Sequence, residues 1–179
     1  MKIAILQIGQ VERSVLKYVQ ESILRVFPQT ACIILRDVIA LPPEAYDSRR
    51  RQYYSSLLLE IIKEYLKKTD ADKILGITTA DLYVPQLNFV FGEAELPGKA
   101  AIISVHRLRP EFYGDSADSP LLLERAAKEA THEIGHTLGL THCTNPLCVM
   151  SFSNTIRDVD TKKQEFCPRC STHLSKVIG

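Results

Sequence analysis

Two histidines four residues apart, His132 and His136, could hold one metal ion between them. On a helix this spacing places both imidazoles on adjacent turns of one face. Glu133 follows the first histidine, where its carboxylate can reach a metal-bound water without ligating the metal. Gly139 marks the point where the helix must stop, and His142 supplies a third nitrogen from beyond it. Three neutral nitrogens leave the fourth tetrahedral position of a zinc ion open, which is typical of a catalytic site.

This arrangement predicts hydrolysis of a peptide bond. Zinc lowers the pKa of bound water to about 7, so hydroxide is available at neutral pH. Glu133 would take the proton of the water, hydroxide would attack a peptide carbonyl polarised by zinc, and Glu133 would pass the proton to the leaving amine. The alternative is a pair of ordinary histidines on a helix surface. The downstream glycine and third histidine favour the metal site.

Four of the five cysteines form a second candidate metal site. They are Cys143, Cys148, Cys167 and Cys170. Two pairs with these spacings are typical of tetrahedral zinc held by four thiolates. Pro168 at a helix start would let the last cysteine fold back toward the other member of its pair. Unpaired thiols in a small core are the alternative, and His173 could replace one cysteine. Since Cys143 directly follows His142, this zinc would also fix the third histidine.

Composition limits the class of protein. The chain has 179 residues, of which 24% are charged and 45% hydrophobic, and a net charge of +1. This length suffices for one compact domain, and the charge gives no electrostatic case for nucleic acid or a membrane surface. The basic run 49–51 is expected to be a solvated helix start. No secretory signal or membrane-spanning run is apparent, so we expect a cytoplasmic monomer whose cysteines ligate metal.

Apolar patterning predicts an α/β (α+β) fold. Continuous apolar strands separated by amphipathic helices indicate a twisted, mostly parallel sheet with helices on its faces. The last two of five expected strands are joined by a connection short enough for a hairpin, so one of them should run antiparallel at an edge. The strands are expected at 2–8, 30–35, 73–79, 88–91 and 100–105, and the first two helices at 11–27 and about 54–65.

A third helix, at about 120–138, is expected to carry the first two histidines. One stripe of this helix is apolar and should pack on the sheet, while His132 and His136 point away from it. The stripe consists of Leu122, Ala126, Ala130, Ile134 and Leu138. We therefore divide the chain into a sheet-and-helix subdomain with the active-site helix, 1–142, and a small zinc-stabilised C-terminal subdomain, 143–179.

The run His-Glu-x-x-His-x-x-Gly-x-x-His-Cys, followed by Cys-x-Met and Cys-x-x-Cys, resembles the archaemetzincins. The resemblance covers 132–170 tightly and extends to 81–85 and 88–91. It implies a metzincin fold of two subdomains around a cleft. It also implies a catalytic zinc on the three histidines and a structural zinc on the four cysteines, two ions in all. The antiparallel edge strand, which we assign to 88–91, would hold an extended peptide.

The resemblance also gives roles to residues after the third histidine. In metzincins a methionine in a tight turn lies beneath the three-histidine site, and Met150 is expected to be that residue. Phe152 stands where astacins and serralysins carry a tyrosine. A phenyl ring cannot donate a hydrogen bond to the oxyanion, so zinc alone, or another donor such as Tyr113, would have to stabilise it.

Two functions follow from these motifs. The first is a zinc-dependent peptidase that acts on peptides, with Glu133 as general base. The alternative is a zinc-stabilised peptide-binding or regulatory protein with little or no turnover. Glu133 favours the peptidase, because a binding module has no use for a base beside the open coordination position.

Overall fold

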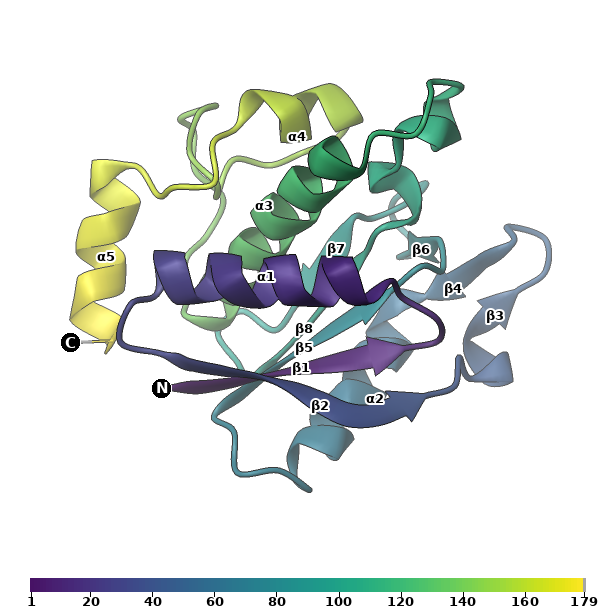
Figure 1. Cartoon of the computed structure of the whole chain (residues 1–179), viewed down its shortest axis with the longest axis horizontal. Coiled ribbons are helices and arrows are strands. Elements are labelled where there is room, and N and C mark those ends of the chain that lie inside the picture. Colours follow the sequence, from purple (N-terminus) through teal and green to yellow (C-terminus); the bar gives the residue numbers. More distant parts are fainter. Residues whose placement is uncertain (179) are drawn as a thin grey trace.

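The computed structural model describes residues 1–178, whose centre is a five-stranded sheet with the strand order β2-β1-β5-β8-β7 (Figure 1). Four of its strands are parallel, and β7 pairs antiparallel with β8 at one edge. The strands are β1 (Lys2–Ile8), β2 (Ala31–Ile39), β5 (Lys73–Thr78), β7 (Gly92–Ala94) and β8 (Ala100–Ser104). The expected mostly parallel sheet with an antiparallel edge strand is confirmed.

Helices cover both faces of this sheet. Figure 1 shows α1 (Arg13–Val26) and α3 (Ser119–Thr137) on one face and α2 (Ser55–Leu66) on the other. Alternate residues of β1 enter different cores: Ile3 and Ile5 pack with α1 and α3, and Leu6 packs with α2. Burial on both faces explains why β1 is apolar without alternation.

Two predicted strand boundaries differ from the structure. β2 continues four residues beyond the expected end at 35, through exposed positions that include Arg36 and Val38. The assignment of the edge strand to 88–91 is wrong, because the strand is Gly92–Ala94. Its register pairs Gly92 with Ile103 and Ala94 with Ala101. The short Gly-Glu-Ala sequence has little intrinsic strand preference, and the pairing depends on the free edge of β8.

A second, three-stranded sheet was not predicted. It contains β3 (Tyr46–Asp47), β4 (Gln52–Tyr54) and β6 (Leu82–Tyr83), in the order β3-β4-β6, and follows a 3-10 turn at Pro43–Ala45. The basic run 49–51 lies in the turn between β3 and β4, so its assignment to a helix start is wrong. Strands of two or three residues are too short to give a periodic apolar signal.

The three histidines and the four clustered cysteines all lie in the part of the chain that follows β8. Two 3-10 turns, at His106–Leu108 and Pro110–Tyr113, lie between β8 and α3. The apolar stripe of α3 is buried as expected. Two further helices follow, α4 (Ile156–Thr161) and α5 (Pro168–Ile178), and α5 begins at the expected proline. None of the helices within 1–178 has the length and apolar character that crossing a bilayer requires.

Candidate active site

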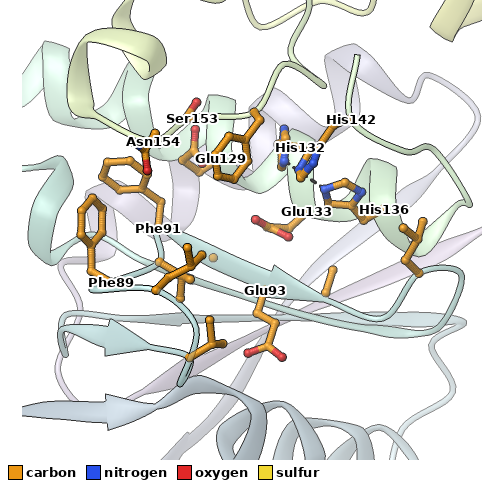
Figure 2. Close-up of a pocket in the computed structure, with 17 residues that line it drawn as sticks. Phe89, Phe91, Glu93, Glu129, His132, Glu133, His136, His142, Ser153 and Asn154 are labelled. Atoms are coloured by element: carbon orange, nitrogen blue, oxygen red, sulfur yellow. Dashed lines mark hydrogen bonds between the residues drawn. The ribbon is translucent and has the colours of Figure 1, made fainter. Parts of the chain in front are cut away.

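Three histidines meet at the end of α3. His132 and His136 lie on the last turns of this helix, and Gly139 then adopts a left-handed conformation, φ 89°, that turns the chain back. The turn brings His142 to the other two, and one ring nitrogen of each lies within 4.8 Å of the others (Figure 2). This is the convergence that the spacing predicts.

Hydrogen bonds fix the orientation of the two helical rings. His132 Nδ1 lies 2.7 Å from the carbonyl oxygen of Val149, and His136 Nδ1 lies 2.7 Å from that of Leu140. Because a carbonyl only accepts, each Nδ1 carries the proton and each Nε2 presents a lone pair to the shared space. The two Nε2 atoms are 3.0 Å apart. Nitrogens bound tetrahedrally to zinc at about 2.0–2.1 Å would be about 3.3 Å apart, so the donors fit this metal.

Their surroundings favour the neutral form of these imidazoles, most strongly for the buried His132 and His136 and less for His142, which is exposed. Desolvation lowers the pKa of His132 well below its usual value and also lowers the pKa values of His136 and His142. The positive charge of Lys162 acts in the same direction on all three. A neutral imidazole is the form that ligates a metal.

Glu133 is buried beside the histidines, with its carboxylate directed toward the cleft (Figure 2). Burial raises its pKa well above the usual value, and the charge of Glu129, one turn earlier on α3, raises it further. A carboxylate with a raised pKa is a stronger base, as general base catalysis near neutral pH requires.

Sequence reasoning missed a buried ion pair next to Glu133. Lys162 Nζ lies 2.7 Å from Glu129 Oε1, and the two side chains are 0% and 3% exposed. Neither of these two atoms has another polar partner within the described residues, so each charge depends on the other. The sequence shows only that Glu129 lies four residues before Glu133, on the same face of the helix. Nothing in the sequence identifies Lys162 as its partner.

A pocket of about 290 Å³ opens in front of the histidines. One wall is β7 with the residues that precede it, including Phe89 and Phe91, whose ring centroids are 5.0 Å apart. The opposite wall is formed by α3 and by Phe152 to Asn154 (Figure 2). The segment 88–91 thus lines the cleft, although it is not the edge strand.

The edge strand β7 is tied to the rest of the molecule through Glu93. Its carboxylate accepts hydrogen bonds from the hydroxyls of Ser55 and Ser56, at the first two positions of α2. Positions at a helix N-terminus favour negative charge, so the contact suits both partners. β7 therefore has a defined position relative to the histidines.

Met150 is completely buried and packs against the active-site helix α3. Gly135, between the two helical histidines, is in close contact with the sulfur of Met150. Phe152 is 49% exposed, and its ring lies 5.0 Å from that of His142. The hydroxyl of Tyr113 donates to the carbonyl oxygen of Arg107 and lines a neighbouring pocket, so this structure gives it no place beside the histidines.

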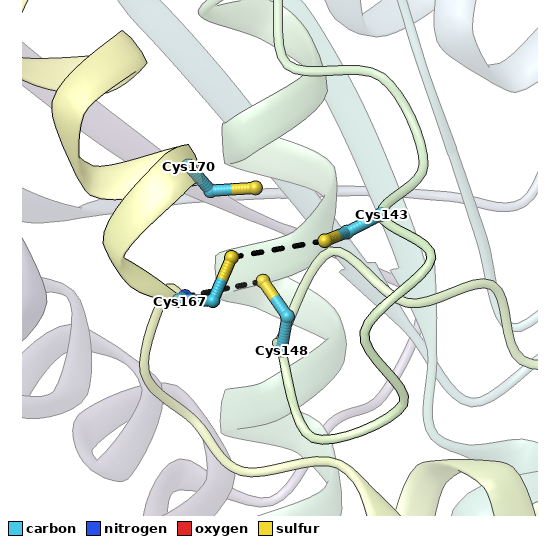
Figure 3. Close-up of side chains that lie close together, drawn as sticks. All are labelled: Cys143, Cys148, Cys167 and Cys170. Carbon is cyan, nitrogen blue, oxygen red and sulfur yellow. Dashed lines mark hydrogen bonds between the residues drawn. The ribbon is translucent and has the colours of Figure 1, made fainter.

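The four cysteines also converge (Figure 3). Their sulfur atoms all lie within 4.8 Å of one another, and Cys143 Sγ is 3.7 Å from Cys167 Sγ. Thiolates on a tetrahedral zinc, with bonds of about 2.3 Å, would be about 3.8 Å apart, so this set fits zinc as well. The backbone N–H of Cys170 lowers the pKa of Cys167 to about 7, which favours the thiolate. His173 is exposed and is not part of the cluster.

Comparisons with known proteins cover nearly the whole chain. The profile of peptidase family M54 matches residues 2–176. The archaemetzincin of Methanocaldococcus jannaschii is 48% identical over 97% of this chain and 93% of its own length. That of Pyrococcus furiosus is 41% identical over 99% of this chain and 94% of its own length.

Solved structures give the same result for the fold. The crystal structure of archaemetzincin from Methanopyrus kandleri has a TM-score of 0.88 and 38% identity, and covers 99% of this chain and 95% of that one. The structure from Archaeoglobus fulgidus, complexed with malonate, has a TM-score of 0.83 and 39% identity, with 97% of this chain and 99% of that one covered.

Proposed function

We propose a catalytic role for the histidine site from the premise that this chain belongs to peptidase family M54, the archaemetzincins, and is a zinc metallopeptidase. In this proposal the enzyme cleaves peptides at the histidine site, and Glu133 acts as the general base. The metal ligands in this proposal are His132, His136 and His142. One observation carries it: three imidazole nitrogens converge beside a buried carboxylate at the wall of an open pocket. Zinc bound there would polarise the scissile carbonyl and make water acidic enough to lose a proton.

The residues of the chain then move protons and hold the substrate. Glu133 accepts a proton from water as the water oxygen bonds to the carbonyl carbon. Glu133 returns that proton to the amide nitrogen as the C–N bond breaks, so the carboxylate is regenerated. An extended peptide would pair with the free edge of β7, which Glu93 anchors to α2.

We further propose that Cys143, Cys148, Cys167 and Cys170 hold a second zinc ion with a structural role. The support is that their four sulfurs lie within 4.8 Å of one another, with Cys143 and Cys167 3.7 Å apart, and that the pKa of Cys167 is lowered. In this proposal 143–179 is a small subdomain stabilised by metal, and each chain carries two ions. Since Cys143 follows His142, the structural ion also positions the third histidine.

The competing function is a peptide-binding protein with little turnover. Phe152 favours it, because a phenyl ring beside His142 offers no hydrogen-bond donor to an oxyanion. The presence of Glu133 favours hydrolysis, so this residue discriminates between the two functions.

The test is Glu133→Ala, with zinc content and peptide hydrolysis measured on the same preparation. We expect two zinc ions per chain in both proteins and loss of hydrolysis in the variant. Glu64→Ala is the control, because Glu64 is a helical glutamate on α2 whose side chain is 64% exposed and whose partner Lys67 is exposed as well. Equal, metal-independent activity in the Glu133→Ala protein would refute the proposal.

A second variant assigns the ions to their sites. Replacing His132, His136 and His142 together by alanine should reduce the zinc content from two ions to one. Loss of both ions, or of neither, would contradict the existence of two separate sites.

A further inference from the structure

A second pocket, of about 370 Å³, adjoins the first, and the two share Phe89 and Asn154 as walls. Its lining includes Arg107 and Arg157 and no acidic side chain. Because the pockets share walls, a peptide that follows the cleft past Phe89 reaches these two arginines. The cleft thus changes from apolar near the histidines to cationic at this end.

Arg107 is held in one orientation. Its Nε and Nη2 donate to the two carboxylate oxygens of Asp81, at 2.7 and 2.8 Å. Its guanidinium carbon also lies 4.3 Å from the ring centroid of Phe89 and 4.8 Å from that of Phe112. Within residues 1–178 the remaining nitrogen, Nη1, has no hydrogen-bond partner. A rigid donor of this kind binds a carboxylate at a lower entropic cost than a mobile side chain does.

Arg157 supplies a second cationic group to this pocket. Its side chain is exposed on α4, and it forms no ion pair in the described part of the chain. The nearby acids are already engaged: Asp81 with Arg107, Asp160 with Arg125, and Asp158 with backbone N–H groups at the start of α4. The lining of the pocket therefore holds two cationic side chains and no carboxylate.

We propose that this pocket is a carboxylate-binding extension of the active-site cleft. The inference rests on the proposed function and narrows its substrate class to peptides with a carboxylate on the side of the scissile bond that passes Phe89. Arg107 Nη1 is the specific donor, and Arg157 adds attraction. An acidic side chain and a C-terminal carboxylate have the same planar pair of acceptor oxygens, so either could occupy the pocket.

Binding to the Glu133→Ala protein, loaded with zinc, tests the proposal without cleavage. One arm compares fluorescent, C-terminally amidated peptides that carry Asp, Asn or Lys at each position along the chain. The other arm compares peptides without acidic residues that end in a free carboxylate or an amide. We expect a carboxylate in at least one arm to tighten binding roughly three- to tenfold over its neutral counterpart, with Lys the weakest.

The variants locate the effect. Arg157→Glu should abolish or reverse the preference, and Arg107→Gln should remove most of it. Arg36→Glu is the control, because Arg36 is an exposed arginine on β2, at the opposite edge of the sheet. Higher salt should weaken the preference. Equal affinity for charged and neutral peptides in both arms would overturn the inference, as would a preference that survives Arg157→Glu and Arg107→Gln unchanged.

The same peptides, given to the wild-type enzyme, separate the two proposals. Hydrolysis without any preference for a carboxylate would contradict the cationic pocket and leave the peptidase intact. Selective binding without hydrolysis would support the pocket and contradict the proposed catalytic function.

Discussion

Gly92 on β7 lies so close to Glu133 that a Cβ at position 92 would be 2.6 Å from the Oε1 atom of that glutamate. The same Cβ would be 2.7 Å from the carbonyl oxygen of Ile102 on β8. Neither distance is compatible with a carbon atom, so any side chain at position 92 must displace the carboxylate or loosen the pairing of the edge strand. The edge strand and the proposed base are in contact only because the residue between them is glycine.

Gly92→Ala should therefore impair catalysis more than metal binding. A displacement of a reacting group by about 1 Å can cost about 10²-fold in rate, and we expect a fall of that order in kcat. Zinc content should be unchanged, since the atoms nearest to a Cβ at this position belong to Glu133 and Ile102 and not to a histidine. Steady-state kinetics below the thermal transition, with zinc analysis of the same sample, checks this. A wild-type kcat in a folded Gly92→Ala protein would show that the contact has no catalytic role.

A second close contact joins Gly135 to Met150. A Cβ at position 135 would be 2.4 Å from the sulfur of Met150. In an ordinary helix interior, glycine to alanine stabilises a protein by about 1 kcal/mol. Here we expect Gly135→Ala to destabilise the protein by about 1–3 kcal/mol, because the buried methionine must move. Combining Gly135→Ala with Met150→Ala should cost less than the sum of the two single changes. Strict additivity in denaturant unfolding would contradict the contact.

The buried pair between Glu129 and Lys162 should show strong coupling. Lys162→Met leaves a buried carboxylate without a partner, and we expect a loss of about 3–5 kcal/mol in unfolding free energy. The double variant Glu129→Leu with Lys162→Met should be close to neutral, because neither charge remains. Lys67→Met is the control: its partner is Glu64 and both side chains are more than 60% exposed, so the change should be within about 0.5 kcal/mol. A similar small effect for Lys162→Met would refute the interpretation.

The histidines should make the metal-free protein sensitive to acid. Their folded-state pKa values lie below the unfolded value of 6.5, chiefly through burial, so the unfolded state binds more protons below that pH. Stability should fall as the pH decreases through about 6.5. Glu133 acts in the opposite direction above pH 4.5, because its folded pKa is raised. We therefore make the measurement in Glu133→Gln, by denaturant unfolding at pH 7.5 and 5.5. Stability that is equal or higher at pH 5.5 would contradict the depressed pKa values.

Much of this site could be predicted from the sequence, because its ligands follow local rules. The positions of His132 and His136 on one helix face follow from helix geometry, and Gly139 provides the turn that returns His142. The five core strands are likewise apolar enough to detect, apart from β7. The cluster of four cysteines could also be predicted, because the short spacing within each pair is a local sequence pattern.

The features that were missed depend on contacts between distant segments. β7 has no apolar run, and it forms a strand only because β8 has a free edge beside it. Lys162 and Glu129 are 33 residues apart in the sequence, and no local sequence pattern predicts a buried ion pair between them. Arg107 is similar: its partners Asp81 and Phe89 precede it by many residues, and only the fold brings them together.

A single peptide bond joins His142 to Cys143, and this has a consequence for when the enzyme becomes competent. Cys167 and Cys170 are synthesised after His142, so a nascent chain that has emerged only that far lacks half of the thiolates that would hold its third imidazole in place. We therefore expect the nascent chain to have no peptidase activity until Cys167 and Cys170 have been synthesised. A chain truncated after Lys163 should accordingly bind zinc at its histidines roughly 10- to 100-fold more weakly than the complete chain. Equal affinity in a competition titration would show that the imidazole cluster assembles independently of the later cysteines.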